Sequence, residues 1–164
     1  MGTSTGILHF NALYGPDLAP YAGDPAAGGQ NFPLTSVKIL PRVLVVDDEG
    51  LLRWSVAEML AGAGYQVVEA QNGREARVAI VDEEHPLDMM LIDLKLPDVD
   101  GLELAREARR HCRTCPILIM TAYGSADTLD AALRAGAHGV IAKPFDLDDL
   151  LRMVRQVCPP ASLH

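Results

Sequence analysis

Five short apolar runs alternate with segments of helical periodicity along this chain, and that alternation limits the possible folds more than any other feature. A strand that is apolar on both faces must be covered on both sides, so it belongs in a parallel sheet between two layers of helices. The sequence therefore predicts an α/β fold. The five runs occupy residues 43–46, 66–70, 89–93, 117–120 and 139–142.

Each run is followed by apolar residues at helical spacing, and four of the predicted helices begin at residues suited to capping. Right-handed crossovers leave few ways to wind five parallel strands. We expect a doubly wound five-stranded parallel sheet with the common order 2-1-3-4-5, the flavodoxin-like arrangement. The predicted caps are Asn72 with Glu75 and Asp100 with Glu103, which have capping-box spacing, and the single residues Ser125 and Asp146.

The chain of 164 residues suits one globular domain and leaves little room for a second. Residues 1–36 hold six of the 14 glycines and four of the 11 prolines, and they contain no Lys or Arg. We expect them to form a flexible N-terminal extension; the alternative is a segment that docks its four aromatic residues on this domain or a neighbour. The predicted domain spans residues 37–158, and residues 159–164 form a C-terminal tail or the start of a linker.

The charge pattern argues against several classes of function. A formal net charge of −8 opposes direct nucleic-acid binding, which needs clustered Lys and Arg. The arginines between Arg106 and Arg113 share one helical pattern, and we interpret them as a solvated face. The sequence contains neither an apolar run of membrane-spanning length nor the features of a signal peptide, so we expect a cytoplasmic protein.

Three cysteines do not form an even disulfide framework. Cys112 and Cys115 have C-x-x-C spacing, but the chain offers no second pair for zinc. The motif also precedes a predicted strand, whereas the redox motif opens a helix. We therefore interpret this segment as a linker.

Polar residues stand where four of the predicted strands end. Asp47 and Asp48 follow the first run, Asp93 ends the third, and Thr121 and Lys143 follow the fourth and fifth. In the order 2-1-3-4-5 these four strands are neighbours, and ligands bind beyond the carboxyl ends of such strands. The five side chains are therefore expected around one crevice.

Three neighbouring carboxylates indicate a cation site. At an effective dielectric of about 20, carboxylates a few Å apart repel by ~4 kcal/mol per pair, and a shared cation relieves this repulsion. Mg²⁺ fits because it prefers carboxylate, water and phosphate oxygens. Thr121 and Lys143 offer a hydroxyl and a positive charge to a phosphoryl group. Asp93, alone on its strand, is the candidate nucleophile for an acyl phosphate.

Four segments of the chain carry, in order and spacing, the signature of a known family. Through them, the stretch from about Arg42 to Cys158 closely resembles the receiver domain of two-component response regulators. Two further stretches look most like the nitrogen-regulation (sigma-54 activator) subfamily, namely Leu52–Trp54 and Met120–Ser125. The four signature segments are Val45–Glu49, Leu91–Gly101, Met120–Ala122 and Ala142–Phe145.

The resemblance implies a signalling switch rather than an enzyme. Asp93 would accept a phosphoryl group from the phosphohistidine of a histidine kinase or phosphotransfer protein, with Mg²⁺ as cofactor. Thr121 and Lys143 would then move onto the phosphoryl oxygens and reshape the face formed by the fourth helix, the fifth strand and the fifth helix, which could also serve a homodimer. The Mg²⁺ ligands carried over are Asp47, Asp48, Asp93 and the backbone carbonyl of Lys95.

One position departs from the family pattern. Val140 stands three residues before Lys143, where the family usually carries Tyr or Phe. The usual coupling of phosphorylation to the partner-binding face through that ring is therefore in question. The phosphorylation chemistry itself does not depend on the ring. Tyr123 either replaces the ring in part or only lines the site with Lys95, where side chains tune the access of water to the phosphoryl group.

Other functions fit the residues less well. An aspartyl-phosphate phosphohydrolase of the haloacid dehalogenase type carries Asp-x-Asp directly after the first strand, and a nucleotide-binding module carries a glycine-rich loop there. This chain has neither. The complete set of acidic residues, Thr and Lys at the strand ends argues against a degenerate receiver that binds partners without phosphorylation. A stand-alone receiver that acts on a downstream protein and a fragment of a longer regulator with its own output domain both remain open.

Overall fold

The computed structural model describes residues 40–160 and shows a five-stranded parallel sheet. The strand order is β2-β1-β3-β4-β5, which confirms the predicted doubly wound topology. The predicted extension, residues 1–36, and residues 161–164 of the predicted tail lie outside the described residues. The strands are β1 (Arg42–Val46), β2 (Gln66–Ala70), β3 (Met89–Asp93), β4 (Ile117–Thr121) and β5 (Gly139–Ala142).

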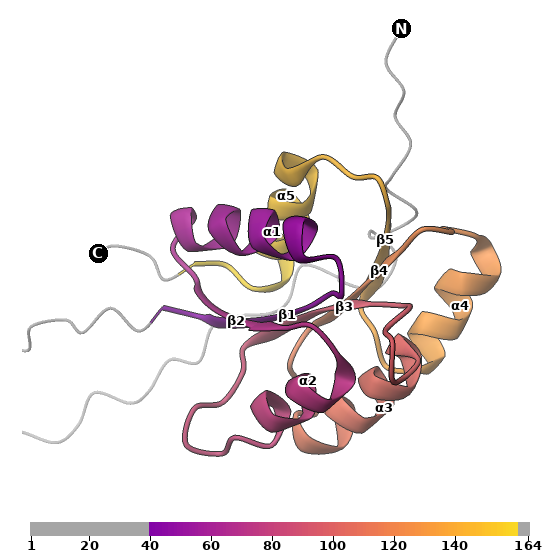
Figure 1. The fold of residues 1–164 in the computed structure, drawn as a ribbon, viewed down its shortest axis with the longest axis horizontal. Helices are drawn as coiled ribbons and strands as arrows, with labels where there is room; N and C mark the ends of the chain where they lie inside the picture. The colour runs from indigo at the N-terminus through magenta and orange to yellow at the C-terminus, as the bar shows by residue number, and fades with distance from the viewer. Residues whose placement is uncertain (1–39, 161–164) are drawn as a thin grey trace, which may run out of the picture.

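Helices cover both faces of the sheet (Figure 1). Helices α1 and α5 lie on one face, and α2, α3 and α4 lie on the other. Among the described residues, no helix combines the length and the apolar character that a membrane crossing requires. The helices are α1 (Gly50–Gly62), α2 (Gly73–Ile80), α3 (Gly101–His111), α4 (Ala126–Arg134) and α5 (Leu147–Val157).

Each face of the sheet has its own hydrophobic core, because successive side chains of a strand point to opposite faces. In β1, Val43 and Val45 pack with residues of α1 and α5, whereas Leu44 and Val46 pack with residues of α2, α3 and α4. Strands β3 and β4 are buried over their whole length, while the edge strand β2 is partly exposed. Burial over the whole length therefore holds for β3 and β4, and β3 ends at Asp93 of the candidate site.

The helix starts follow the predicted caps with one correction. The first turns of α2, α4 and α5 are capped as expected, by the side chains of Asn72, Ser125 and Asp146. At α3, Asp100 accepts a hydrogen bond from the Leu102 N–H at 2.8 Å and not from the Glu103 N–H, so the capping-box pairing predicted there is wrong. The side chain of an N-cap residue can reach either the second or the third amide of the helix, and spacing alone does not decide between them.

Arg109 corrects the interpretation of the arginine-rich segment as a solvated face. Its guanidinium donates hydrogen bonds to the carbonyls of Cys112, Arg113 and Cys115 at 3.1, 2.8 and 2.9 Å, and to the carbonyl of Gly136 at 2.6 Å. Loop carbonyls lack strand partners, so this side chain satisfies them. Arg109 thus ties the C-x-x-C connection, whose cysteines are free thiols, to the turn before β5.

Tyr65 ties the start of β2 to the end of α5. The side chain is buried, and its hydroxyl donates a hydrogen bond to the Cys158 carbonyl at 2.6 Å. Tyr65→Phe should lower the free energy of unfolding by about 1–2 kcal/mol at neutral pH, because the buried carbonyl loses its donor. Urea unfolding of the two proteins measures this difference, and equal stabilities would contradict the assigned role.

The same phenol predicts a stability change at alkaline pH. Burial raises the pKa of Tyr65 from 10.0 to about 12, so folding favours the neutral phenol. This contribution is complete below pH 10 and is lost as the pH rises through about 12. The stability difference between wild type and Tyr65→Phe should therefore shrink over that interval.

Candidate functional site

The carboxyl ends of β1, β3 and β5 bring three charged side chains together. Asp47 follows β1, Asp93 ends β3 and Lys143 follows β5. The Lys143 Nζ atom lies 2.7 Å from Asp47 Oδ2 and 3.1 Å from Asp93 Oδ2. Parallel strands end at the same edge of a sheet, so the observed strand order places these residues next to one another at that edge, as the sequence predicts.

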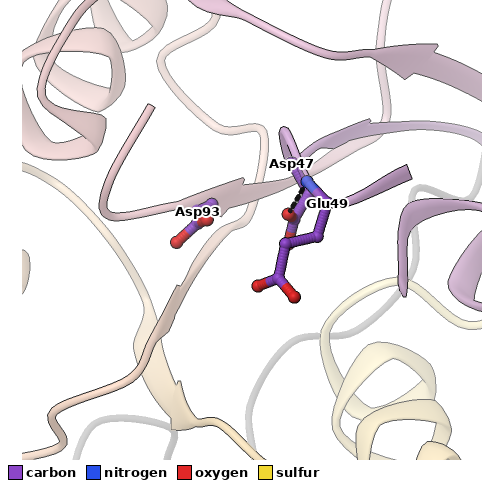
Figure 2. A group of neighbouring side chains, drawn as sticks. All are labelled: Asp47, Glu49 and Asp93. Atoms are coloured by element: carbon purple, nitrogen blue, oxygen red, sulfur yellow. Dashed lines mark hydrogen bonds between the residues drawn. The ribbon is translucent and has the colours of Figure 1, made fainter. Parts of the chain in front are cut away.

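Glu49 is the third carboxylate of this acidic group, which consists of Asp47, Glu49 and Asp93 (Figure 2). One carboxylate oxygen from each residue lies within 4.8 Å of the others, and Glu49 Oε1 is 3.1 Å from Lys143 Nζ. The sequence predicts Asp48 in this place, but Asp48 is exposed and lies outside the acidic group. The Glu49 N–H donates a hydrogen bond to Asp47 Oδ1 at 2.8 Å (Figure 2). The backbone turns at this bond, just after β1, and Glu49 lies close to Asp47.

Asp93 is nearly buried, with a side chain that is 8% exposed. Burial raises the pKa of the Asp93 carboxyl, the positive charge of Lys143 opposes this rise, and the carboxylate of Asp47 adds to it; the net shift is upward. A cation beside these carboxylates would favour the ionised form of Asp93. The ionised form is the one that can act as a nucleophile.

Thr121, Tyr123 and Lys95 lie at or just beyond the carboxyl ends of β4 and β3. The Thr121 hydroxyl is buried and accepts a hydrogen bond from the Tyr123 N–H at 3.1 Å. The Lys95 ammonium lies 5.3 Å from the centroid of the exposed Tyr123 ring, within cation–π range. The Lys95 N–H also donates to Asp93 Oδ1 at 3.3 Å. The structure therefore brings the side chains of Lys95 and Tyr123 together, and their role in lining the site stays a prediction.

Val140 fills the position at which the family usually carries a ring. It is 5% exposed in β5 and belongs to the core on the α2, α3 and α4 side of the sheet. Tyr123, the alternative aromatic residue, is 71% exposed. The two positions thus differ in environment, since Val140 is a core position and Tyr123 a surface position.

The donor set of the acidic group suits a hard divalent cation. Among the described residues the group offers carboxylate oxygens only, without His or Cys. Mg²⁺ binds one or two carboxylates together with water and phosphate oxygens, so these residues fit it. Lys143 neutralises the same carboxylates, which makes Lys143 and a cation alternative partners for Asp47 and Asp93.

Known regulators are similar to the same part of the chain. Residues 43–155 match the family described as response regulator receiver domain. The chain is 39% identical to the regulatory protein AtoC of Escherichia coli over 115 residues, which are 70% of this chain and 24% of AtoC. It is 34% identical to the DNA-binding transcriptional regulator NtrC of Salmonella typhimurium over 114 residues, again 70% of this chain and 24% of NtrC. The chain thus spans about a quarter of the length of these two relatives.

A shorter relative is matched over nearly its whole length. The chain is 36% identical to sporulation initiation phosphotransferase F of Bacillus subtilis over 118 residues, which are 72% of this chain and 94% of that protein. The similarity therefore covers regulators of different kinds at similar identity.

Solved structures share the fold. A response regulator receiver domain protein (CheY-like) from Methanospirillum hungatei superposes with a TM-score of 0.67 at 32% identity, over 71% of this chain and 92% of that one. A response regulator protein from Burkholderia pseudomallei, solved with a phosphorylated aspartic acid, a calcium ion and citrate, gives a TM-score of 0.63 at 29% identity, over 68% of this chain and 64% of that one.

Receiver domains are phosphoacceptor regulatory modules of two-component signalling, with a histidine kinase as partner, rather than enzymes. The family match covers more than half of the chain, the observed sheet order is the predicted one, and an acidic group that includes Asp47 and Asp93 lies at the strand ends. The chain belongs to the response regulator receiver domain family.

Proposed function

We propose that this chain is a phosphorylation-controlled switch in which Asp93 accepts a phosphoryl group from the phosphohistidine of a histidine kinase or a phosphotransfer protein. The observation that carries this proposal is the setting of Asp93, a nearly buried carboxylate 3.1 Å from Lys143 Nζ and beside two further carboxylates. The phosphorylated aspartic acid of the Burkholderia pseudomallei regulator supports the same chemistry. Phosphorylation by acetyl phosphate with Mg²⁺, and its loss when Asp93 is replaced, tests the proposal.

Each residue of the site has a different role in the phosphoryl transfer. A carboxylate oxygen of Asp93 attacks phosphorus while the bond from phosphorus to the donor histidine breaks, which leaves an acyl phosphate and a neutral histidine. Lys143 stabilises the charge on the transferred group, and Mg²⁺ when bound neutralises its oxygens. The Thr121 hydroxyl donates a hydrogen bond to the Tyr123 carbonyl at 3.4 Å and must leave it to donate to a phosphoryl oxygen, so phosphorylation shifts the segment that leads into α4.

The proposed Mg²⁺ ligands are those carried over from the family: Asp47, Asp48, Asp93 and the backbone carbonyl of Lys95. Asp47 and Asp93 are supported by their proximity in the acidic group. Asp48 and Glu49 are competing candidates for the remaining carboxylate, because only Glu49 lies in that group while the family pattern favours Asp48.

Two single substitutions distinguish which of these two acidic residues binds Mg²⁺. We expect Asp48→Asn to weaken Mg²⁺ binding by at least about tenfold, the smallest loss typical of a metal site that is disturbed, and Glu49→Gln to weaken it by less than about threefold. The reason is that the family pattern assigns a ligand role to Asp48 and none to Glu49. Isothermal titration calorimetry measures the dissociation constant of Mg²⁺ for both variants. The reverse order would assign the ligand role to Glu49.

The wider context of the module is also part of the proposal. The receiver domain occupies residues 37–158, preceded by an extension at residues 1–36 and followed by a tail or linker at residues 159–164. Similarity to AtoC and NtrC supports the nitrogen-regulation subfamily, with an output domain beyond the tail. The match over nearly all of sporulation initiation phosphotransferase F supports a stand-alone receiver with a separate downstream partner.

The proposed output surface is the face formed by α4, β5 and α5, which could also support a homodimer. Thr121 and Lys143 stand at the ends of β4 and β5, so a change at the phosphoryl group reaches this face directly. Val140 lacks the ring of the family pattern, and we propose that the movement of Thr121 alone carries the signal. A cytoplasmic location remains a prediction.

A further inference from the structure

Asp98 joins two parts of the molecule that are far apart in sequence. It lies in the loop between β3 and α3, the loop that also carries Lys95. Asp98 Oδ1 accepts a hydrogen bond from the Gly73 N–H at 2.7 Å, and Oδ2 accepts one from the Arg74 N–H at 3.0 Å. Both amides belong to the first turn of α2 and lack partners within the helix. One carboxylate therefore caps α2 from outside.

The loop is packed directly against the start of α2. A Cβ atom added to Gly73 would lie 2.3 Å from Val99 Cγ1 and 3.2 Å from Asp98 Oδ1. Such distances leave no space for a side chain at residue 73. The absence of a side chain thus lets Asp98 and Val99 approach the backbone of α2.

The end of the same loop is fixed against β3. A Cβ atom on Gly101 would lie 2.2 Å from the Asp93 carbonyl oxygen, and the Gly101 N–H donates to the Leu94 carbonyl at 2.8 Å. Lys95 and Asp100 also form an isolated antiparallel bridge. The loop is therefore held at its base by β3 and at its outer part by α2, with Lys95 between these anchors.

We propose that Asp98 is a positioning residue for the cation site. By bonding the first turn of α2, its carboxylate fixes the loop that presents the Lys95 carbonyl, so Mg²⁺ binding and the order of the first turn of α2 are coupled. Asp98 itself does not contact the metal. This inference rests on the proposed function of the site, in which the Lys95 carbonyl is a ligand.

The test compares Asp98→Ala with Asn72→Ala in the full chain. Both variants remove one side-chain cap of α2, but the Asn72 side chain accepts its hydrogen bond from the Glu75 N–H within the helix, whereas Asp98 reaches α2 from the loop. We expect Asp98→Ala to weaken Mg²⁺ binding by roughly tenfold, as the loss of an outer-shell partner does, and Asn72→Ala to change it by less than about twofold. Isothermal titration calorimetry with MgCl₂ gives these constants, and far-ultraviolet circular dichroism confirms the folded state.

A second readout follows from the reciprocity of coupled equilibria. In the wild type, Mg²⁺ should slow hydrogen exchange at the Gly73 and Arg74 amides, and in Asp98→Ala this effect should vanish. Asp98→Asn keeps an acceptor for one of the two amides and should recover part of the Mg²⁺ affinity. It also serves as the test variant if Asp98→Ala does not fold.

Three outcomes overturn the inference and can be told apart. A wild type that binds no Mg²⁺ refutes the proposed function together with the inference. Normal Mg²⁺ binding by both Asp98 variants refutes the inference alone. Equal losses in Asp98→Ala and Asn72→Ala show that only the stability of α2 matters, which also refutes a positioning role.

Discussion

Replacing Asp93 with asparagine should abolish phosphorylation of the chain by acetyl phosphate in the presence of Mg²⁺, whereas we expect the wild type to gain one phosphoryl group. Asparagine has nearly the same shape, but its amide is not a nucleophile for phosphorus. Asp47 cannot take over, because it is fully buried and held by the Glu49 N–H at 2.8 Å and by Lys143 at 2.7 Å. Intact mass measurement reports both results.

Asp130→Asn is the matched control, since it makes the same chemical change on the exposed surface of α4. We expect it to be phosphorylated like the wild type. Asp93→Asn should be at least as stable as the wild type in thermal unfolding, because it removes one charge from a crowded acidic group. Labelling of Asp93→Asn at the wild-type level would place the acceptor on another residue.

Lys143→Ala leaves the carboxylates of Asp47, Glu49 and Asp93 without their shared positive charge. The Asp47 side chain is fully buried and that of Asp93 is 8% exposed, so neither can be solvated well. We expect the free energy of unfolding to fall by roughly 3 kcal/mol at pH 7 without Mg²⁺, the usual cost of breaking a buried ion pair. Saturating Mg²⁺ should recover much of this loss, because it binds the folded state and replaces the missing charge.

The loss should also depend on pH. The pKa of Asp93 is raised by burial and lowered by Lys143, so removing Lys143 raises it further. A carboxyl whose pKa is higher in the folded than in the unfolded state costs stability as the pH rises from about 4 towards neutral. The difference between Lys143→Ala and the wild type should therefore be small at pH 4 and large at pH 7.

Urea unfolding at both pH values, with and without Mg²⁺, measures these differences. Lys143→Arg keeps the positive charge and should retain part of the stability at pH 7, although its planar group fits the three carboxylates less well. A loss that is the same at both pH values and insensitive to Mg²⁺ would show that the alkyl chain of Lys143, and not its charge, is what matters.

The fold could be predicted from the sequence because each central strand is a short apolar run and the helices from α2 to α5 begin with a capping signal. The run from Met89 to Asp93 is a strand in the structure with the same bounds. Because the strand order then fixes which ends are neighbours, the meeting of Asp47, Asp93 and Lys143 also followed from the sequence.

The features that were missed depend on contacts that a local pattern does not encode. Three acidic residues follow β1 in succession, and only Asp47 and Glu49 belong to the acidic group. The turn of the backbone, in which the Glu49 N–H bonds Asp47, brings in Glu49 and leaves Asp48 outside. Arg109 resembles a solvated helix residue, yet the Gly136 carbonyl that it binds lies 27 positions away. Asp98 resembles a turn residue, yet its partner Gly73 lies 25 positions away.

Locating the phosphoryl group in the wild-type chain tests most directly whether Asp93 is the phosphoacceptor. The chain is incubated with acetyl phosphate and Mg²⁺ and digested, and the peptides are compared by mass with those of a sample without Mg²⁺. We expect one phosphoryl group, on the peptide that contains Asp93, and only when Mg²⁺ is present. A phosphoryl group on a different peptide, or none while Mg²⁺ binds, would contradict the proposed switch.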